Sequence, residues 1–276
     1  MRRRIAVLFH ETDNLETIRQ FGVMGLAEAW REQGHEVRCL FGTGTRAEAD
    51  LVFVHVDLSV VPDAYLEFAA EYPVSVNGRV KDIRKSAFSE QLLGPEDAWE
   101  GPVIVKSDRN YAGLPEAWRG VPRLDGSGLR PAFPSSMAYR VYASLREVPP
   151  AAFACPDLVV ERFLPEEEDG LYHVRCYEFL GDREACVRNV SPHPIVKLAT
   201  VVARESIRPH PDIVALRRRL EFDYGKFDYV EREGRAVILD LNKTTGMSPS
   251  AGPMLDADRR DRAEGLYAFF RGPGRG

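Results

Sequence analysis

The sequence predicts an α/β protein whose first part forms a parallel sheet and whose later part is α+β with mainly antiparallel strands. Two observations support this class. Up to about residue 80, short aliphatic runs alternate with segments of helical periodicity, which is the pattern of parallel βαβ units in a doubly wound sheet. Further along, strand-like runs are joined by tight turns, which indicates antiparallel hairpins.

The first 80 residues are expected to contain the βαβ elements. We expect strands at 4–9, 35–41, 49–58 and 72–77. Helices are expected at 18–30, between the first two strands, and at 62–72, before the last strand. Gly34 follows the first helical pattern and predicts its end.

The rest of the chain mixes helices with strands. Helices are expected at 82–93, 211–221 and 256–270, and strands at 102–108 and 158–165. Residues 172–190 are typical of two antiparallel strands joined near Gly181 and Asp182, and a second hairpin follows at 226–242.

Composition narrows the possible functions. The chain has 276 residues, of which 44% are hydrophobic and 29% charged, as in ordinary globular proteins. Its formal net charge of −5 argues against a nucleic-acid partner, which usually requires a basic surplus. The four cysteines lack any zinc-type spacing and are typical of thiols in a reducing cytosol.

The N-terminus does not read as a signal peptide. Its apolar run at 5–9 is too short for an h-region, and no stretch of the chain has the apolar length that spans a bilayer. We therefore expect a cytoplasmic protein without a membrane partner.

The hairpin at 226–242 carries oxygen ligands inside hydrophobic runs. With its turn centred on Glu233, side chains alternate between two faces of the sheet. One face would contain Lys226, Asp228, Asp240 and Asn242, and the other Phe227, Tyr229, Val237, Leu239 and Leu241. In this register Asp228 and Asp240 are diagonal neighbours, close enough to reach one ion.

Two chemical interpretations of the polar face remain open. Two carboxylates and an amide oxygen are hard ligands, suited to Mg²⁺ that also holds substrate phosphates. Lys226 projects onto the same face, where it would meet anionic oxygen. The alternative is a solvated face whose acids pair with surface lysines.

The segment "GKFDYV…ILDLNKTTG" resembles the metal-binding hairpin of the ATP-grasp superfamily, in which an Asp precedes Glu-x-Asn and a Pro-Gly-type turn. This chain has Asp240 in place of the Glu, and Thr245 before Gly246. The resemblance covers about the C-terminal two-thirds of the chain and is closest to the group of glutathione synthetase, D-alanine–D-alanine ligase and ribosomal-protein glutamate ligase. It implies an N-terminal domain at 1–80 and two lobes at 81–165 and 166–276 that clamp a nucleotide.

The resemblance also implies roles for single residues. ATP and Mg²⁺, with Mn²⁺ as an alternative, would be the cofactors. Lys85 and Lys106 would contact the phosphates, and "SDRNYAG" at 107–113 would cover them. Further expected nucleotide contacts are Glu161 to the adenine amine, the backbone of Phe163 and Leu164 to the ring edge, and Glu168 to the ribose. Arg175, Arg188 and Lys226 are the expected catalytic cations, and Asp228, Asp240 and Asn242 the expected metal ligands.

The implied activity is ATP-dependent joining of a small-molecule or peptide carboxylate to an amine through an acyl phosphate, with ADP and phosphate released. Kinase-like phosphoryl transfer and a non-catalytic nucleotide-binding module are the alternatives. The segment 191–206 is expected to border the acceptor site, and the strand ends near His10 and Asp57 are a second possible contact surface. The sequence fixes neither the two substrates nor the oligomeric state, for which a homodimer is one option.

Overall fold

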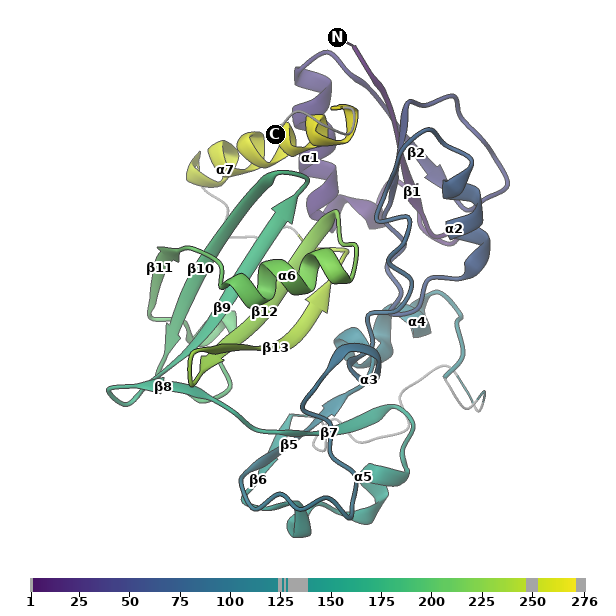
Figure 1. Ribbon diagram of the computed structural model, residues 1–276. Coiled ribbons are helices and arrows are strands. Elements are labelled where there is room, and N and C mark those ends of the chain that lie inside the picture. The colour runs from purple at the N-terminus through teal and green to yellow at the C-terminus, as the bar shows by residue number, and fades with distance from the viewer. Residues whose placement is uncertain (1, 124–125, 127, 129–138, 247–252, 272–276) are drawn as a thin grey trace.

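A computed structural model describes residues 2–123, 126, 128, 139–246 and 253–271. Within these residues the strands form three sheets, which are named here the parallel sheet, the small sheet and the large sheet. In Figure 1 the parallel sheet lies at the upper right, the small sheet at the bottom and the large sheet at the left. The domain limits given above stay a prediction.

The parallel sheet has the predicted doubly wound arrangement. Its strands are β1 (Arg4–Phe9), β2 (Glu36–Phe41), β3 (Leu51–Val54) and β4 (Ser75–Val76), in the order β2-β1-β3-β4 and all parallel. Helix α1 (Gly22–Glu32) packs on the face that contains Val7, and α2 (Asp63–Ala70) packs on the face that contains Leu8. The aliphatic run of β1 is therefore buried on both faces.

The first helix is shorter than its periodicity indicated. A 3₁₀ turn, η1 (Thr17–Gln20), precedes it, and Phe21 between the two is extended with φ −85° and ψ 138°. The helix runs to Glu32, and Gly34 adopts a φ of 87°, which a glycine tolerates without strain.

The small sheet is antiparallel and contains β5 (Val103–Ser107), β6 (Arg140–Tyr142) and β7 (Leu158–Arg162), in the order β6-β5-β7. The short elements around it are α3 (Lys85–Phe88), η2 (Asn110–Gly113), α4 (Leu114–Trp118), η3 (Leu145–Glu147) and α5 (Pro150–Ala154).

The prediction of a helix over 82–93 was wrong for most of that segment, because only 85–88 are helical. The later residues instead pair with β7: the Leu93 amide donates to the Val160 carbonyl at 2.8 Å, and the Arg162 amide donates to the Gln91 carbonyl at 2.9 Å. Tertiary pairing has overridden the local helical pattern.

The large sheet is antiparallel. It contains β8 (Glu166–Glu168), β9 (Leu171–Leu180), β10 (Arg183–Ser191), β11 (Ala203–Ile207), β12 (Tyr224–Arg232) and β13 (Arg235–Asn242). The order is β11-β10-β9-β12-β13, with β8 paired to β9. Helix α6 (Pro211–Arg219) covers one face, where Ile213 and Leu216 pack against Tyr177 and Phe227. A 3₁₀ turn, η4 (Leu198–Thr200), lies between β10 and β11.

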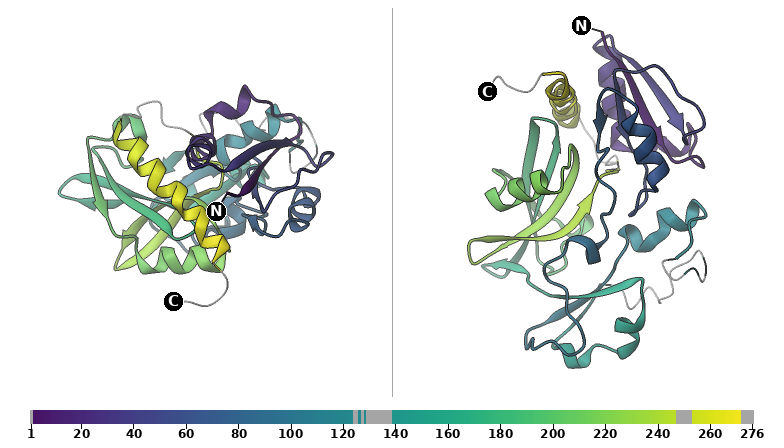
Figure 2. Two further views of the ribbon diagram at one scale, coloured as in Figure 1. Left: turned by 90° about the horizontal axis from the view of Figure 1, so that it is seen from above. Right: turned by 45° about the vertical axis from the view of Figure 1, so that its right-hand side comes forward.

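The C-terminal helix joins the large sheet to the parallel sheet. It starts as α7 (Pro253–Ala263) and continues as the 3₁₀ segment η5 (Glu264–Phe270), so the predicted helix at 256–270 changes type after Ala263. Both views in Figure 2 show α7 beside α1 and the large sheet. The Trp30 indole donates to the Ala263 carbonyl at 3.0 Å. Among helices of the described residues, none has the length and apolar character needed to cross a membrane.

The register of β12 and β13 differs from the prediction. The turn consists of Glu233 and Gly234, both with positive φ (52° and 73°), and a bulge follows, so that Asp228 lies directly opposite Asp240 rather than diagonally. Ile238, and not Leu239, is the residue opposite Tyr229 in the core. The prediction that Val237 and Leu239 share the face of Tyr229 was therefore wrong.

Candidate functional site

A cavity of about 200 Å³ lies where the small sheet meets the large sheet. Its lining combines an apolar part with a charged part. The lining residues are Lys85, Ile104, Lys106, Tyr139, Arg162, Phe163, Leu164, Pro165, His173, Val174, Pro194, Ile195, Val196, Asp228, Val230, Leu239 and Asp240. Six of the predicted site residues therefore line one cavity, although they are distant in the sequence.

Lys85 lies at the start of α3 and is only 1% exposed. Its Nζ is 3.1 Å from Asp240 Oδ1 and donates to Asn110 Oδ1 at 3.4 Å. Burial alone would lower the pKa of Lys85, but the Asp240 carboxylate raises it above its usual value. The ammonium group therefore stays charged at neutral pH.

Lys106 lies near the end of β5 and is the second cation of the cavity. Its Nζ is 2.6 Å from Glu161 Oε2 and donates to the Leu239 carbonyl at 3.4 Å. Glu161 lies opposite Ile104 in the sheet and is buried, but it does not line the cavity. The structure thus places Glu161 as the partner of Lys106.

The two acids of the hairpin face each other across β12 and β13. Each is balanced by its own lysine, because Lys226 Nζ is 2.9 Å from Asp228 Oδ2 while Lys85 is close to Asp240. Burial would lower the pKa of Lys226, but the Asp228 carboxylate raises it. In the described part of the chain, the buried Asp228 Oδ1 has no hydrogen-bond partner.

Asn242 completes the predicted ligand set, directly opposite Lys226. It is buried, and its Oδ1 accepts a hydrogen bond from the Thr244 amide at 2.8 Å. Over the described ranges no three His, Cys, Asp or Glu side chains come together as a metal cluster. The candidate cation site therefore consists of two carboxylates and one amide.

Arg175 and Arg188 are not brought to the cavity. In the register of the large sheet Asp228 lies opposite Cys176, whereas Arg175 lies opposite Tyr229 and Arg188. Because neighbouring residues of a strand point to opposite faces, both arginines project away from the acids.

Glutamates hold both arginines on that far face. Arg175 is 2.7 Å from Glu166 and also pairs with Glu231. Arg188 pairs with Glu205 at 2.8 Å and with Glu168 at 3.1 Å. Glu168 is exposed and does not line the cavity either.

Several lining residues were not predicted as site residues. Ile104, Val174 and Leu239 belong to the apolar wall, and only the bulge brings Leu239 there. His173 also lines the cavity and is buried, and no sequence signal distinguished it from a core residue. Of the segment 191–206, Pro194, Ile195 and Val196 line this cavity, whereas His193 and Lys197 do not.

Asn110 belongs to the segment that the resemblance placed over the phosphates, but it is buried. Its main-chain amide donates to Ser59 Oγ at 3.0 Å, and its Nδ2 donates to the Leu241 carbonyl at 2.7 Å. Together with its contact to Lys85, these bonds connect the small sheet to both other parts of the molecule.

The strand ends near His10 and Asp57 lie against charged groups. Arg119 is 2.9 Å from Asp13 and 3.4 Å from Asp57, and Thr244 Oγ1 donates to Asp57 Oδ1 at 2.6 Å. The second predicted contact surface therefore adjoins the end of β13.

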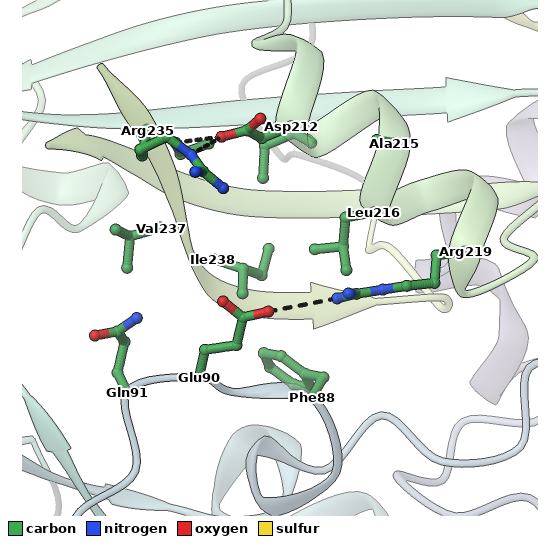
Figure 3. Close-up of a pocket in the computed structure, with 12 residues that line it drawn as sticks. Phe88, Glu90, Gln91, Asp212, Ala215, Leu216, Arg219, Arg235, Val237 and Ile238 are labelled. Atoms are coloured by element: carbon green, nitrogen blue, oxygen red, sulfur yellow. Dashed lines mark hydrogen bonds and ion pairs between the residues drawn. The ribbon is translucent and has the colours of Figure 1, made fainter. Parts of the chain in front are cut away.

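A second cavity of about 230 Å³ lies between α6, β13 and the segment that follows α3. Figure 3 shows its apolar floor, which includes Phe88, Leu216 and Ile238. Ion pairs border it, Asp212 with Arg235 at 2.8 Å and Glu90 with Arg219 at 3.6 Å. None of the predicted site residues lines this cavity.

No family model and no curated protein sequence matches this chain. Solved structures do match in fold over nearly the whole length. D-alanine–D-alanine ligase from Bacillus anthracis is 12% identical with a TM-score of 0.53, over 97% of this chain and 96% of that chain. A RimK domain ATP-grasp protein from Sphaerobacter thermophilus is 14% identical with a TM-score of 0.52, over 96% and 98% of the two chains.

The ATP-grasp ligase PsnB, in a complex with a minimal precursor, Mg and ADP, is 13% identical with a TM-score of 0.54, over 96% of this chain and 97% of that chain. These identities are low, so the likeness concerns the fold. The fold of this chain is therefore similar to that of solved ATP-grasp proteins.

Proposed function

We propose that this protein is an ATP-dependent carboxylate–amine ligase that releases ADP and phosphate. One observation carries the proposal: an apolar cavity between two sheets ends at two opposed carboxylates, each paired with a lysine. The names of the structural neighbours, which include two kinds of ligase, support the same reaction class.

The nucleotide would enter the cavity with its base against the apolar wall. Ile104, Val174 and Leu239 offer apolar surface to a flat ring, and the backbone at Phe163 and Leu164 offers hydrogen-bonding groups to its edge. The phosphates would then point towards the charged end. There Lys85 and Lys106 are buried ammonium groups suited to phosphate oxygen.

The residues at that end fit a divalent cation. Asp228 and Asp240 are opposed, Asn242 adds an amide oxygen, and Asp228 Oδ1 is buried without a hydrogen-bond partner among the described residues. Carboxylate and amide oxygens are ligands that Mg²⁺ and Mn²⁺ accept. When bound, the cation would neutralise charge on the phosphates.

The proposed reaction has two steps. A carboxylate oxygen of the acid attacks the γ-phosphorus, and the bond to the β-phosphate oxygen breaks, which gives an acyl phosphate and ADP. The amine nitrogen then attacks the acyl carbon, and phosphate leaves as the nitrogen loses a proton. Lys85 and Lys106 would stabilise the negative charge of the first step, and Lys226 would hold Asp228 in place.

Arg175 and Arg188 have no part in this proposal, because they project from the opposite face of the large sheet. Glu168 has none either. The substrate acid and amine would bind beside the charged end of the cavity, on the face of the large sheet opposite to the two arginines.

The test is Asp240→Asn, which removes the charge and keeps the shape. Turnover should fall by about 10²–10³-fold, since one misplaced or lost electrostatic contact in a transition state costs about 3–4 kcal/mol. ADP release with pooled acids and pooled amines measures turnover, and circular dichroism checks the fold. Glu205→Gln, an acid of the same sheet on the far side, is the matched control and should keep full activity.

Adding hydroxylamine to the same assay distinguishes ligation from kinase-like phosphoryl transfer. An acyl phosphate gives a hydroxamate, whereas the phosphoester that a kinase makes on a hydroxyl group does not. Unchanged ADP release by folded Asp240→Asn would contradict the proposed site, and nucleotide binding without turnover over the whole panel would favour a non-catalytic module.

A further inference from the structure

The chain that leaves the candidate cation site is tied to the parallel-sheet part of the molecule. Residues 243–246, here called the clasp, follow Asn242 directly. The Thr245 carbonyl accepts a hydrogen bond from the Gly22 amide at 2.7 Å, and Gly246 forms an isolated bridge with Phe21. The Thr245 hydroxyl, by contrast, bonds to the Tyr224 hydroxyl at the start of β12, within the large-sheet part, at 2.6 Å.

Lys243 is the most deeply held residue of the clasp. Its side chain is only 1% exposed, and its Nζ donates to the main-chain carbonyls of Val56, at 3.2 Å, and Leu58. Both carbonyls lie just beyond the end of β3. A buried ammonium group needs such acceptors, and a side chain fixed in this way fixes its own main chain as well.

Thr244, the next residue, also bonds to the parallel-sheet part. Its hydroxyl donates to Asp57 Oδ1 at 2.6 Å, and its amide donates to Asn242 Oδ1 at 2.8 Å. An amide oxygen has two lone pairs, so the bond from Thr244 leaves one lone pair of Asn242 for a cation and sets its direction. On the other side of Asn242, the Leu241 carbonyl is held by Asn110.

We propose that Lys243, together with Thr244, is a positioning residue: by anchoring the clasp to the carbonyls after β3, it holds the Asn242 oxygen where the divalent cation binds. The inference rests on the proposed function. It gives the parallel-sheet part a role in cation binding without any cation contact of its own. Mg²⁺ requires near-ideal octahedral geometry, so a displaced ligand weakens its binding.

The experiment measures ADP binding by calorimetry over a series of Mg²⁺ concentrations. Lys243→Met keeps the length of the side chain and removes its donors. We expect the Mg²⁺ concentration for half-maximal effect to rise by about 10–100-fold, which is typical when a residue behind a metal ligand is lost. ADP affinity without Mg²⁺ should not change.

Thr245→Val is the matched control. It removes the bond to Tyr224 from the same clasp, but Thr245 does not contact Asn242. Its melting temperature should fall while its Mg²⁺ requirement stays that of the wild type. If both variants shifted the Mg²⁺ requirement equally, Lys243 would only help to hold the parallel-sheet part against the large sheet. That result would overturn the inference.

A further variant covers the case in which Lys243→Met does not fold. Thr244→Val removes only the hydroxyl bond to Asp57 and should still raise the Mg²⁺ requirement, so an unchanged requirement would overturn the inference. Measurements on the wild type distinguish a failure of the proposed function from a failure of the role of Lys243 and Thr244. If it binds no ADP at any Mg²⁺ concentration, the proposed function fails; if it binds and the variants match it, only the role of Lys243 and Thr244 fails.

Discussion

At the scale of single residues, His55 is an unusual group for a core. It follows β3, is fully buried, and its ring lies among those of Phe9, Phe21 and Tyr224 at centroid distances of 5.4, 4.8 and 6.4 Å. Neither ring nitrogen has a hydrogen-bond partner within the described residues. Burial, with a smaller contribution from the charge of Lys243, lowers the pKa of His55 to about 3. The imidazole is therefore neutral in the folded protein.

His55 should make the protein less stable in mild acid. The unfolded chain binds a proton below a pKa of about 6.5 and the folded chain does not, so stability is complete above that pH and falls as the pH is lowered towards 3. The loss should be up to about 1.4 kcal/mol per pH unit. Urea unfolding between about pH 7 and pH 4 measures it.

The variant for this test is His55→Phe, which keeps a ring and cannot take up a proton. The free energy of unfolding of His55→Phe should vary less steeply with pH than that of the wild type. His193→Gln, at an exposed position, should keep the wild-type slope. A slope of His55→Phe equal to that of the wild type would show that His55 can be protonated within the fold.

At the scale of elements, the C-terminal segment packs on the β9–β10 turn through glycines. A Cβ added to Gly265 would lie 1.9 Å from the Leu180 carbonyl oxygen, and one added to Gly181 would lie 2.1 Å from the Gly265 carbonyl oxygen. Two main chains therefore touch where the hairpin turns. This contact helps to dock α7 and η5 against the large sheet.

Gly265→Ala should destabilise the protein by about 1–3 kcal/mol, because a methyl group forced into a packed contact displaces the main chain. Chemical denaturation measures the change. The matched control is Gly44→Ala, since Gly44 has no neighbouring atom within 4 Å of an added Cβ and no positive φ. If both variants lost the same stability, the contact between η5 and the turn would not be tight.

The sequence predicted best those elements whose hydrophobic residues follow a regular local periodicity. The strands of the parallel sheet are aliphatic runs, and the hairpin turn at Gly181 separates two alternating strands, so local periodicity was enough. The bulge at Leu239 was not predictable, because the residues around it continue the same alternation of side chains. The helix prediction for 89–93 was wrong for another reason: this segment pairs with β7, which is distant in the sequence.

At the scale of the whole molecule, the candidate site depends on contacts between parts. Lys85 meets Asp240, and Lys106 meets the Leu239 carbonyl, across more than one hundred residues of chain. Only the order of motifs in the family resemblance predicted that these residues would meet. Strand alternation alone places the side chains of Arg175 and Cys176 on opposite faces of the sheet. The sequence of one strand does not show, however, which of the two faces lines the cavity.

The parallel-sheet part and the large sheet are also joined through one buried asparagine. Asn77 follows β4 with a φ of 57° and is fully buried. Its Nδ2 donates to the Tyr224 carbonyl at 2.8 Å, and its Oδ1 accepts from the amides of Asp223 and Tyr224, both at 3.0 Å. Its own amide donates to Asp223 Oδ2 at 2.8 Å. The side chain of Asn77 thus supplies hydrogen-bond partners for main-chain groups at the start of β12.

Asn77→Gly should separate the hydrogen bonds of this side chain from its backbone conformation. Glycine adopts a positive φ freely, so the loss of about 3 kcal/mol that we expect would come from three buried bonds at about 1 kcal/mol each. Asn77→Ala should lose about 1–2 kcal/mol more, because alanine is strained in the left-handed region. Urea unfolding followed by tryptophan fluorescence, to which the buried Trp30 contributes, and by circular dichroism measures both variants. If Asn77→Gly were as stable as the wild type, the three side-chain bonds of Asn77 would add no net stability. A wild type whose two signals change at different urea concentrations would show that the two parts do not unfold as one unit.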